Sequence, residues 1–386
     1  MLTPEFQERF RWRDWLPWLM LLRTWEFALR GTPLACALLA TLLCWGAQDL
    51  ARRVEGTSKP EVSLELTPML SEGISFPVKP LPHEAWIAGL QTGPAPADPF
   101  WPWRAVAEPL QQVLRVSSWR GSIGVALAAG LQFIVWAWLG AVISRQAVGC
   151  LTETRDSFPA ALTFGFRRWP NAIGGPCLPL AASALLATLL VVLTFPGRLP
   201  WLLGPAWLIA ISPVLVLIGL MAAFLVGVLL LSWPLIQSAV AVDRDCDGFN
   251  ALSRVYNYVT MRPWHLAWYV LVILVTGPLV LFAAEWLVGS TVSLLTRMAT
   301  IGAGATGHGP AFESTLVWWA KLGLTAFAAS YFWSATGLTY VLLRRSVDGI
   351  PCDQFVPIGR VERNREPYPV VGMAAAAPVV EASNPE

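Results

Sequence analysis

The sequence predicts an all-α fold, a polytopic bundle of about six transmembrane helices. Of the 386 residues, 55% are hydrophobic and 13% are charged, whereas soluble domains carry about 25% charged residues. Apolar runs long enough for the ~20 residues that a bilayer crossing needs alternate with short charged segments. The net charge of +2 is too small to predict nucleic-acid binding, so the lipid bilayer is the expected partner.

Residues 1–30 form an unusual N-terminal segment in which arginine alternates with tryptophan and phenylalanine. Tryptophan favours the headgroup layer and arginine attracts anionic lipid, so the segment predicts either an interfacial helix or a leader that orients the first span. The first span is expected at residues 27–47. Residues 48–120 are polar and proline-rich and predict an extracytoplasmic loop, which Phe100-Trp-Pro-Trp returns to the membrane interface.

Residues 121–343 predict a membrane domain with five further spans. These spans are expected at about Gly121 to Ser144, Leu178 to Phe195, Pro213 to Ile236, Leu266 to Val288 and Leu316 to Leu343. The apolar stretch from Trp201 to Ser212 is predicted to lie at the interface, with a re-entrant pair bending at Ser212 and Pro213 as the alternative. Residues 344–386 form a cytoplasmic tail that we expect to be disordered toward its end.

The distribution of basic residues predicts the orientation. The N-terminal segment, the second and fourth loops and the tail hold 17 of the 27 Lys and Arg residues. Most of the others lie in the long loop of residues 48–120, which the positive-inside rule discounts. Both termini are therefore expected in the cytoplasm.

Two short segments between spans read as amphipathic cytoplasmic helices, near residues 156–168 and 247–262. Both open with Asp, a small residue and Phe, and both end at a Trp/Pro pair before the next span, so we interpret them as a duplicated span/amphipathic-helix/span unit. They can lie on lipid headgroups or pack under the bundle. Their apolar faces are expected to include Phe249, Leu252 and Tyr256 in one helix and Phe158, Leu162 and Phe166 in the other.

Two stretches carry a resemblance. Asp247-Gly-Phe-Asn-Ala-Leu-Ser-Arg-Val-Tyr-Asn-Tyr-Val with Arg262-Pro-Trp, and Tyr340-Val-Leu-Leu-Arg-Arg-Ser-Val-Asp-Gly, resemble an uncharacterised family of polytopic bacterial inner-membrane proteins. The layout from about Gly121 to Asp353 is also similar to the membrane domain that accompanies some glycerophosphodiesterases. The resemblance implies a multi-pass protein of the bacterial inner membrane with six spans, and it implies no catalytic residue.

Few residues suggest chemistry. Asp243-x-Asp-x-Asp-Gly matches the head of a calcium loop, but the twelfth position, which must be glutamate, is Arg254, so a helix-capping turn is expected instead. Glu285 and Lys321 are predicted to meet near the outer surface, either as a structural pair or solvated ends, or as part of a transport site. We expect no catalytic residue, no metal site and no cofactor.

These observations favour a non-enzymatic role. The leading hypothesis is a scaffold or an accessory subunit of a membrane or envelope complex, with a membrane or envelope protein as partner. The alternative is a transporter or channel for a small molecule or lipid, with a site between the repeated units.

Overall fold

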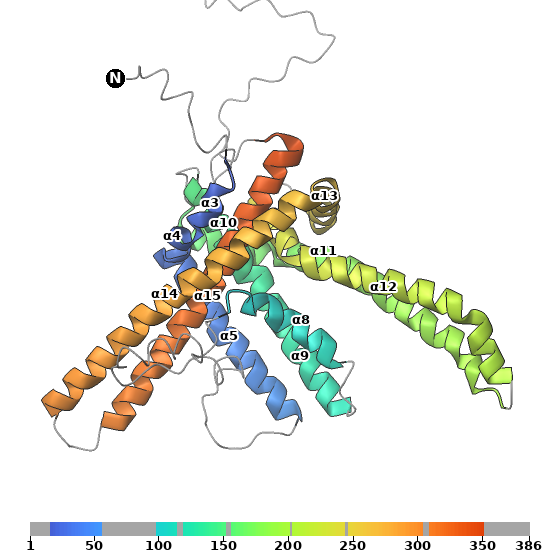
Figure 1. Cartoon of the computed structure of the whole chain (residues 1–386), viewed down its shortest axis with the longest axis horizontal. Helices are drawn as coiled ribbons and strands as arrows, with labels where there is room; N and C mark the ends of the chain where they lie inside the picture. Colours follow the sequence, from blue (N-terminus) through green and yellow to red (C-terminus); the bar gives the residue numbers. More distant parts are fainter. Residues whose placement is uncertain are drawn as a thin grey trace, which may run out of the picture.

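The computed structural model of the chain describes residues 16–55, 98–113, 119–151, 156–200, 203–243, 246–303 and 309–350. Within these ranges the chain is helical and contains no strand, which confirms the all-α fold (Figure 1). The helices are α3 (Leu19–Leu22), α4 (Thr24–Ala28), α5 (Gly31–Glu55), α8 (Trp101–Val113), α9 (Trp119–Val135), the π-helical turn η1 (Trp136–Gly140), α10 (Ala141–Leu151), α11 (Phe158–Thr194), the 3₁₀ turn η2 (Phe195–Arg198), α12 (Leu203–Val242), α13 (Gly248–Met261), α14 (Pro263–Ala303) and α15 (Gly309–Asp348).

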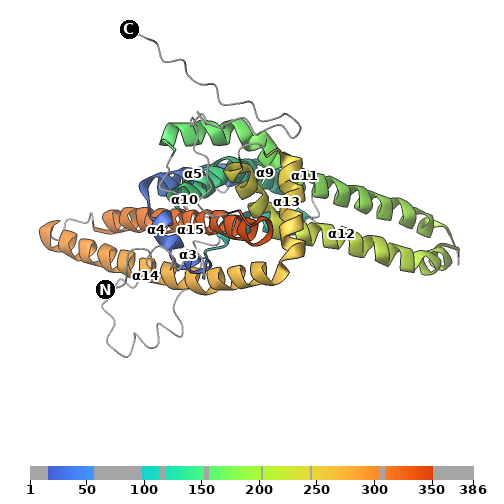
Figure 2. The same cartoon turned by 90° about the horizontal axis from the view of Figure 1, so that it is seen from above.

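The long helices form three legs that spread from a common hub. One leg pairs α14 with α15, the second contains α5, α8 and α9, and the third is the antiparallel pair of α11 and α12 (Figures 1 and 2). The hub contains α10, α13, the C-terminal part of α12 and the C-terminal half of α15. Helix α15 touches all three legs, so it is the central helix of the molecule.

Among the described residues, five segments are long and apolar enough to cross a membrane: Gly31–Ala51, Gly121–Leu151, Phe158–Arg198, Leu203–Val242 and Pro263–Gly302. The sixth predicted span coincides with α15, which is equally long but less apolar. Its residues from Leu324 to Arg344 are buried by the other helices. A helix with protein neighbours on every side does not need a lipid-like surface, which explains its lower hydropathy.

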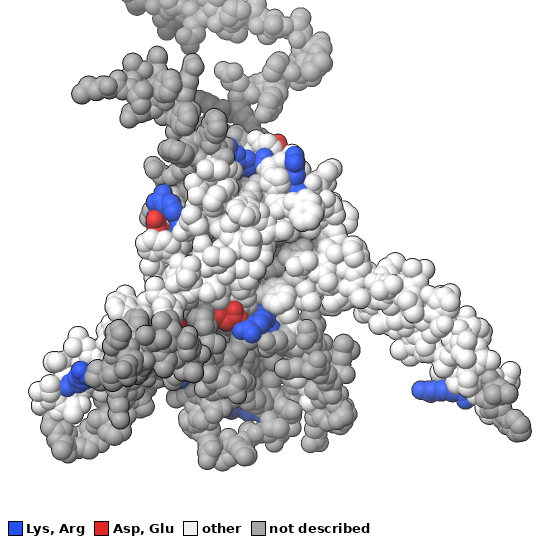
Figure 3. All heavy atoms as spheres, viewed as in Figure 1, with Lys and Arg blue, Asp and Glu red and all other residues white. Residues whose placement is uncertain are grey.

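Charged residues mark a band of membrane thickness. Lys321 and Arg344 are 23 residues apart on α15, and Arg262 and Glu285 bracket a stretch of the same length at α14. At 1.5 Å per residue both stretches measure about 35 Å, close to the ~30 Å hydrocarbon core of a bilayer. Figure 3 shows basic and acidic side chains near the hub and basic side chains on two legs, and between them one patch where acidic and basic side chains adjoin at the centre of the view.

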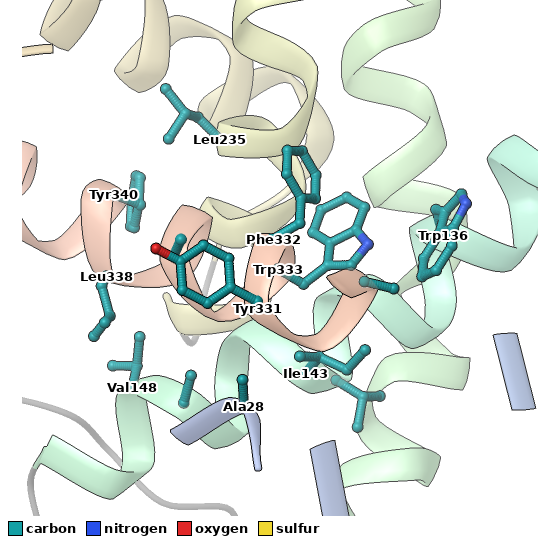
Figure 4. Close-up of a cluster of buried hydrophobic side chains, with 14 of the residues drawn as sticks. Ala28, Trp136, Ile143, Val148, Leu235, Tyr331, Phe332, Trp333, Leu338 and Tyr340 are labelled. Carbon is teal, nitrogen blue, oxygen red and sulfur yellow. The ribbon is translucent and has the colours of Figure 1, made fainter. Parts of the chain in front are cut away.

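A cluster of tryptophans fills the centre of the bundle. The Trp333 ring on α15 lies 5.8 Å from the Trp136 ring of η1 and 5.5 Å from the Trp233 ring of α12, and all three are fully buried. Figure 4 shows Trp333 and Trp136 side by side with Phe332. Gly140 permits this packing, because a Cβ there would lie 2.5 Å from the Trp333 ring.

Two predicted boundaries are wrong. Helix α11 continues from Phe158 to Thr194 through Pro170, so the segment near 156–168 is its first part and not a separate helix. Helix α12 likewise continues through Pro213, without the re-entrant bend that was the alternative at Ser212 and Pro213. A proline removes one backbone hydrogen bond but only kinks a helix whose other contacts hold it, and α11 and α12 pack against each other along their length.

The N-terminal segment is described from residue 16 onward. Within it, Leu21 and Phe27 are buried, and the Ala28 carbonyl accepts a hydrogen bond from the Ser330 hydroxyl at 2.8 Å. Helices α3 and α4 therefore pack into the hub, instead of lying only on a lipid surface. The predicted disordered tail and most of the long loop of residues 48–120 lie outside the described residues.

Candidate functional site

A buried carboxylate, Asp243, joins three elements at the hub. It follows the last residue of α12 and accepts hydrogen bonds from the Tyr340 hydroxyl at 2.6 Å and from the guanidinium groups of Arg344 and Arg254 at 2.7 Å and 2.9 Å. The side chains of Asp243 and Arg344 are only 9% and 8% exposed, whereas Arg254 is half exposed. The carboxylate thus fixes α13 and α15 to the end of α12.

A second buried ion pair joins α10 to the start of α11. The Arg145 Nε donates to Asp156 at 2.7 Å, and its Nη1 donates to the Ala241 carbonyl of α12 at 2.8 Å. Arg168 donates to the backbone carbonyl of Asp243 at 2.9 Å, so a cation lies at the C-terminal end of α12, where the helix dipole favours it. The Phe164 ring is covered by both guanidinium groups, at 4.2 Å from Arg145 and 4.8 Å from Arg168.

Helix α13 is positioned by its own cap and by two further contacts. Asp247 accepts from the Asn250 backbone N–H at 2.7 Å, which confirms the predicted helix-capping role. The Tyr258 hydroxyl donates to Asp348 at the end of α15, and burial together with this hydrogen bond raises the pKa of Tyr258. Arg254, at the position where a calcium loop needs glutamate, is bound to Asp243.

The predicted amphipathic faces are only partly turned toward the protein. Leu252, Tyr256 and Leu162 are half-buried, whereas Phe249 and Phe166 are 66% and 59% exposed and Phe158 is 38% exposed. On α13 the residues that pack fully against the hub are Ala251, Val255 and Tyr258. Phe249, Phe166 and Phe158 are exposed and can contact lipid headgroups, so headgroup contact stays a prediction.

Glu285 and Lys321 lie on α14 and α15, which pack against each other. Both side chains are half-buried and each has a further interaction within the structure. The proposal that they form an intramembrane pair remains a prediction.

A different ion pair lies at the edge of the bundle, with side chains 25% and 41% exposed, and was missed by the sequence analysis. Asp98 and Arg104 form a salt bridge at the start of α8. In this part of α8, Trp101 is buried and donates its Nε1–H to the Thr325 carbonyl of α15 at 3.0 Å. Trp103 donates to the Leu230 carbonyl of α12 at 2.7 Å. The signal in the sequence was a carboxylate and an arginine six positions apart that flank a run of aromatic residues.

The Asp98–Arg104 pair borders a crevice of about 650 Å³ between α8, α12, α14 and α15. Its lining is mostly apolar and consists of Asp98, Pro99, Phe100, Trp103, Arg104, Leu231, Pro234, Leu235, Leu266, Val270, Ile273, Leu274, Pro278, Phe332, Ala335, Thr336 and Thr339. The volume lies within the ~300–1,000 Å³ range of small-molecule sites, and an apolar lining with a few polar groups is typical of them. The crevice is therefore a candidate ligand site, whereas the hub network is a structural clamp.

Comparisons with protein-family profiles, with curated proteins and with solved structures find no match for the chain. The resemblance to bacterial inner-membrane proteins accordingly stays an expectation. What the sequence and the fold establish together is a helical chain with several segments that are apolar enough to cross a membrane.

Proposed function

We propose that the chain is a non-enzymatic multi-pass protein of the bacterial inner membrane, with both termini in the cytoplasm. It acts as a scaffold or accessory subunit that holds another membrane protein against the paired helices α11 and α12, named here the arm. The observation that carries the proposal is the exposed apolar surface of the arm. In their most apolar stretches only 6% of the residues of α12 and 11% of those of α11 are buried, compared with 50% for Gly121–Leu151.

The length of the arm supports a partner other than bulk lipid. Helix α12 has 40 residues and no charged residue, so it is about 60 Å long, roughly twice the ~30 Å thickness of the hydrocarbon core. It must lie strongly tilted to stay within the core, well beyond the average tilt of about 20°. Figure 1 shows the arm leaning away from the other two legs. A partner packed beside the arm stabilises such a tilt, because helix packing sets tilt in membranes.

A row of small residues marks where a partner helix fits. Gly219, Ala223 and Gly227 recur at intervals of four on α12, and a Cβ added at either glycine meets nothing within 4 Å. Small residues at this spacing let two helices approach closely in a membrane. The row is open toward the outside of the chain and can therefore receive another helix.

The test is photocrosslinking in native membranes, with the crosslinking amino acid placed at Leu220 or Phe224 of α12. Leu287 of α14 is the matched control, because it has a similar exposed fraction of 62% against 64% and 66%. We expect one membrane protein in stoichiometric amount on α12 and not on α14, identified by mass spectrometry. Crosslinks to lipid alone, to a second copy of this chain alone, or equally at both helices would overturn the accessory role.

A second variant separates binding from folding. Gly227→Ile adds a side chain where the chain itself has open space, so the protein should fold but lose the partner adduct. Gly130 on α9 has the same open surroundings, so the control variant Gly130→Ile should keep the partner adduct. An adduct unaffected by Gly227→Ile would show that the partner does not use this row.

The crevice beside Asp98 and Arg104 favours a second candidate function, binding of a lipid or a small apolar molecule. The sequence analysis connected a possible transport site with Glu285 and Lys321. The crevice is a better candidate for a lipid or small-molecule site than these two residues are. Its walls come from α8, α12, α14 and α15.

A further inference from the structure

We propose that the crevice between α12 and α14 binds the hydrocarbon chain of a membrane lipid with an uncharged polar head, such as the hydroxyl group of a diacylglycerol, placed beside the Asp98–Arg104 pair. Three properties of the crevice support this inference. It opens toward the bilayer, it lies near the middle of the membrane, and its polar wall, formed by Asp98 and Arg104, carries no net charge. It does not depend on the partner proposed for the arm.

The crevice opens to the lipid side of the bundle. Leu231 on α12 and Leu274 on α14 both line it, and they are also 63% and 49% exposed. These two residues therefore form its outer edge, while Phe332 and Ala335 of α15 form its floor. Both edge helices are candidate membrane spans, so the molecules that reach this edge first are the lipids of the bilayer.

The polar wall lies near the middle of the membrane. Phe100, two residues after Asp98, packs its ring 6.0 Å from that of Phe332. Phe332 stands 12 residues before Arg344 and 11 after Lys321, which is about 18 Å and 16 Å along the helix. Ionisable groups at such depth are costly and by default indicate a functional site.

The charge of the wall selects the head group. Asp98 and Arg104 neutralise each other, so a charged lipid head would add an uncompensated charge at membrane depth. Arg104 nevertheless has a buried Nε–H that finds no acceptor among the described residues. Because the Arg104 side chain is 41% exposed, it can turn toward the crevice, where a hydroxyl or ester oxygen would satisfy this donor without adding charge. The occupant is thus expected to carry a neutral acceptor at the end of a long apolar chain.

The experiment uses the full-length protein in phosphatidylcholine nanodiscs that contain a trace of a photoreactive diacylglycerol. Labelled peptides are mapped by mass spectrometry, and unlabelled diacylglycerol or phosphatidic acid with the same chains is added as competitor. We expect labelling concentrated on the crevice residues. Diacylglycerol should compete at least about tenfold better than phosphatidic acid, because each 1.4 kcal/mol of charge burial gives a factor of ten.

Two variants on one helix provide a matched comparison. Leu274→Trp fills the crevice and should reduce labelling about tenfold, whereas Leu279→Trp, on the same helix, 63% exposed and outside the lining, should not. Leu231→Trp narrows the crevice from the opposite helix and replaces Leu274→Trp if that variant does not fold. Equal labelling in both α14 variants, or labels spread evenly over lipid-facing positions, would show bilayer contact only and refute the site.

A charge variant tests the role of the ion pair. Asp98→Asn keeps a side chain that can cap the Phe100 N–H, which Asp98 now accepts at 2.9 Å, but leaves the Arg104 charge uncompensated. The preference should then reverse, with phosphatidic acid competing better than diacylglycerol. An unchanged order of competitors would overturn the assignment of the head group to this wall.

Discussion

Replacing Asp243 by asparagine should destabilise the protein strongly, because three donors meet at its carboxylate. Arg344 is 8% exposed and bound to Asp243 at 2.7 Å, and Asp243→Asn removes the buried carboxylate from this ion pair. Breaking a buried pair by removing one partner costs about 3–5 kcal/mol. The asparagine oxygen still accepts one hydrogen bond, so we expect the free energy of unfolding to fall by about 3 kcal/mol, the low end of this range. The Arg254 contact adds little, because that side chain is half exposed.

The assay is equilibrium unfolding in mixed micelles, followed by tryptophan fluorescence, with the free energy of unfolding compared between variants. Asp49→Asn is the control, since its ion pair with Arg53 is 43% and 71% exposed and should contribute between 0 and about 1 kcal/mol. The double variant Asp243→Asn/Arg344→Met removes both charges and should regain most of the loss. Equal losses for Asp243→Asn and Asp49→Asn would refute the view that the hub is held by a buried network.

Three further predictions concern close contacts and a buried thiol. Gly140→Ala should lower the free energy of unfolding by about 1–3 kcal/mol through its clash with Trp333, while Gly130→Ala, where a Cβ meets nothing within 4 Å, should not; equal effects would contradict this packing. Gly248→Ala places a Cβ 2.5 Å from a backbone carbonyl of α11 and should cost a similar amount, measured by the same unfolding assay. Burial, and to a smaller extent the nearby carboxylate of Asp243, raises the pKa of Cys246 to about 11. Its thiol is therefore protonated at neutral pH, and the stability linked to this shift is present below the ordinary thiol pKa of about 8.5 and lost as the pH rises through about 11. In a variant with no other cysteine, its alkylation rate should rise with a midpoint near pH 11, whereas a midpoint near pH 8.5 would contradict a buried thiol.

The long apolar helices could be predicted because they depend on composition over windows of about 20 residues. The cap of α13 could be predicted because Asp247 and the first turn that it caps are adjacent in sequence. The ends of α11 and α12 could not, since the prolines at positions 170 and 213 are compatible with either a break or a kink. Which of the two occurs depends on the packing of one helix against the other, and hydropathy does not report that packing.

The central place of α15 was missed for a related reason. Its hydropathy suggested one more span, but the content of small and hydroxyl residues, such as Ser330, Ser334 and Gly337, distinguishes it from α12. Such residues favour contact with other helices over contact with lipid, and Gly337 indeed lies so close to Ser144 of α10 that a Cβ would be 2.9 Å from its carbonyl. The Asp98–Arg104 site was harder to find, because only the fold brings these residues next to α12, α14 and α15.

Helix α12 belongs both to the hub and to the arm. Its C-terminal end is fixed by Asp243 and by the arginine contacts at its last carbonyls, whereas the stretch that carries Gly219 and Gly227 projects away from the bundle. Between these two parts lie Leu231 and Leu235, which form one wall of the crevice. A partner on the arm and a lipid in the crevice would therefore act on the same helix. If a partner changes the angle of α12, it changes the width of the crevice, and the linkage must be reciprocal: the lipid then alters the affinity for the partner by the same factor. Because Arg344 and Arg168 hold the C-terminal end of α12 at the hub, a change in the angle of α12 would displace mainly the stretch toward the arm.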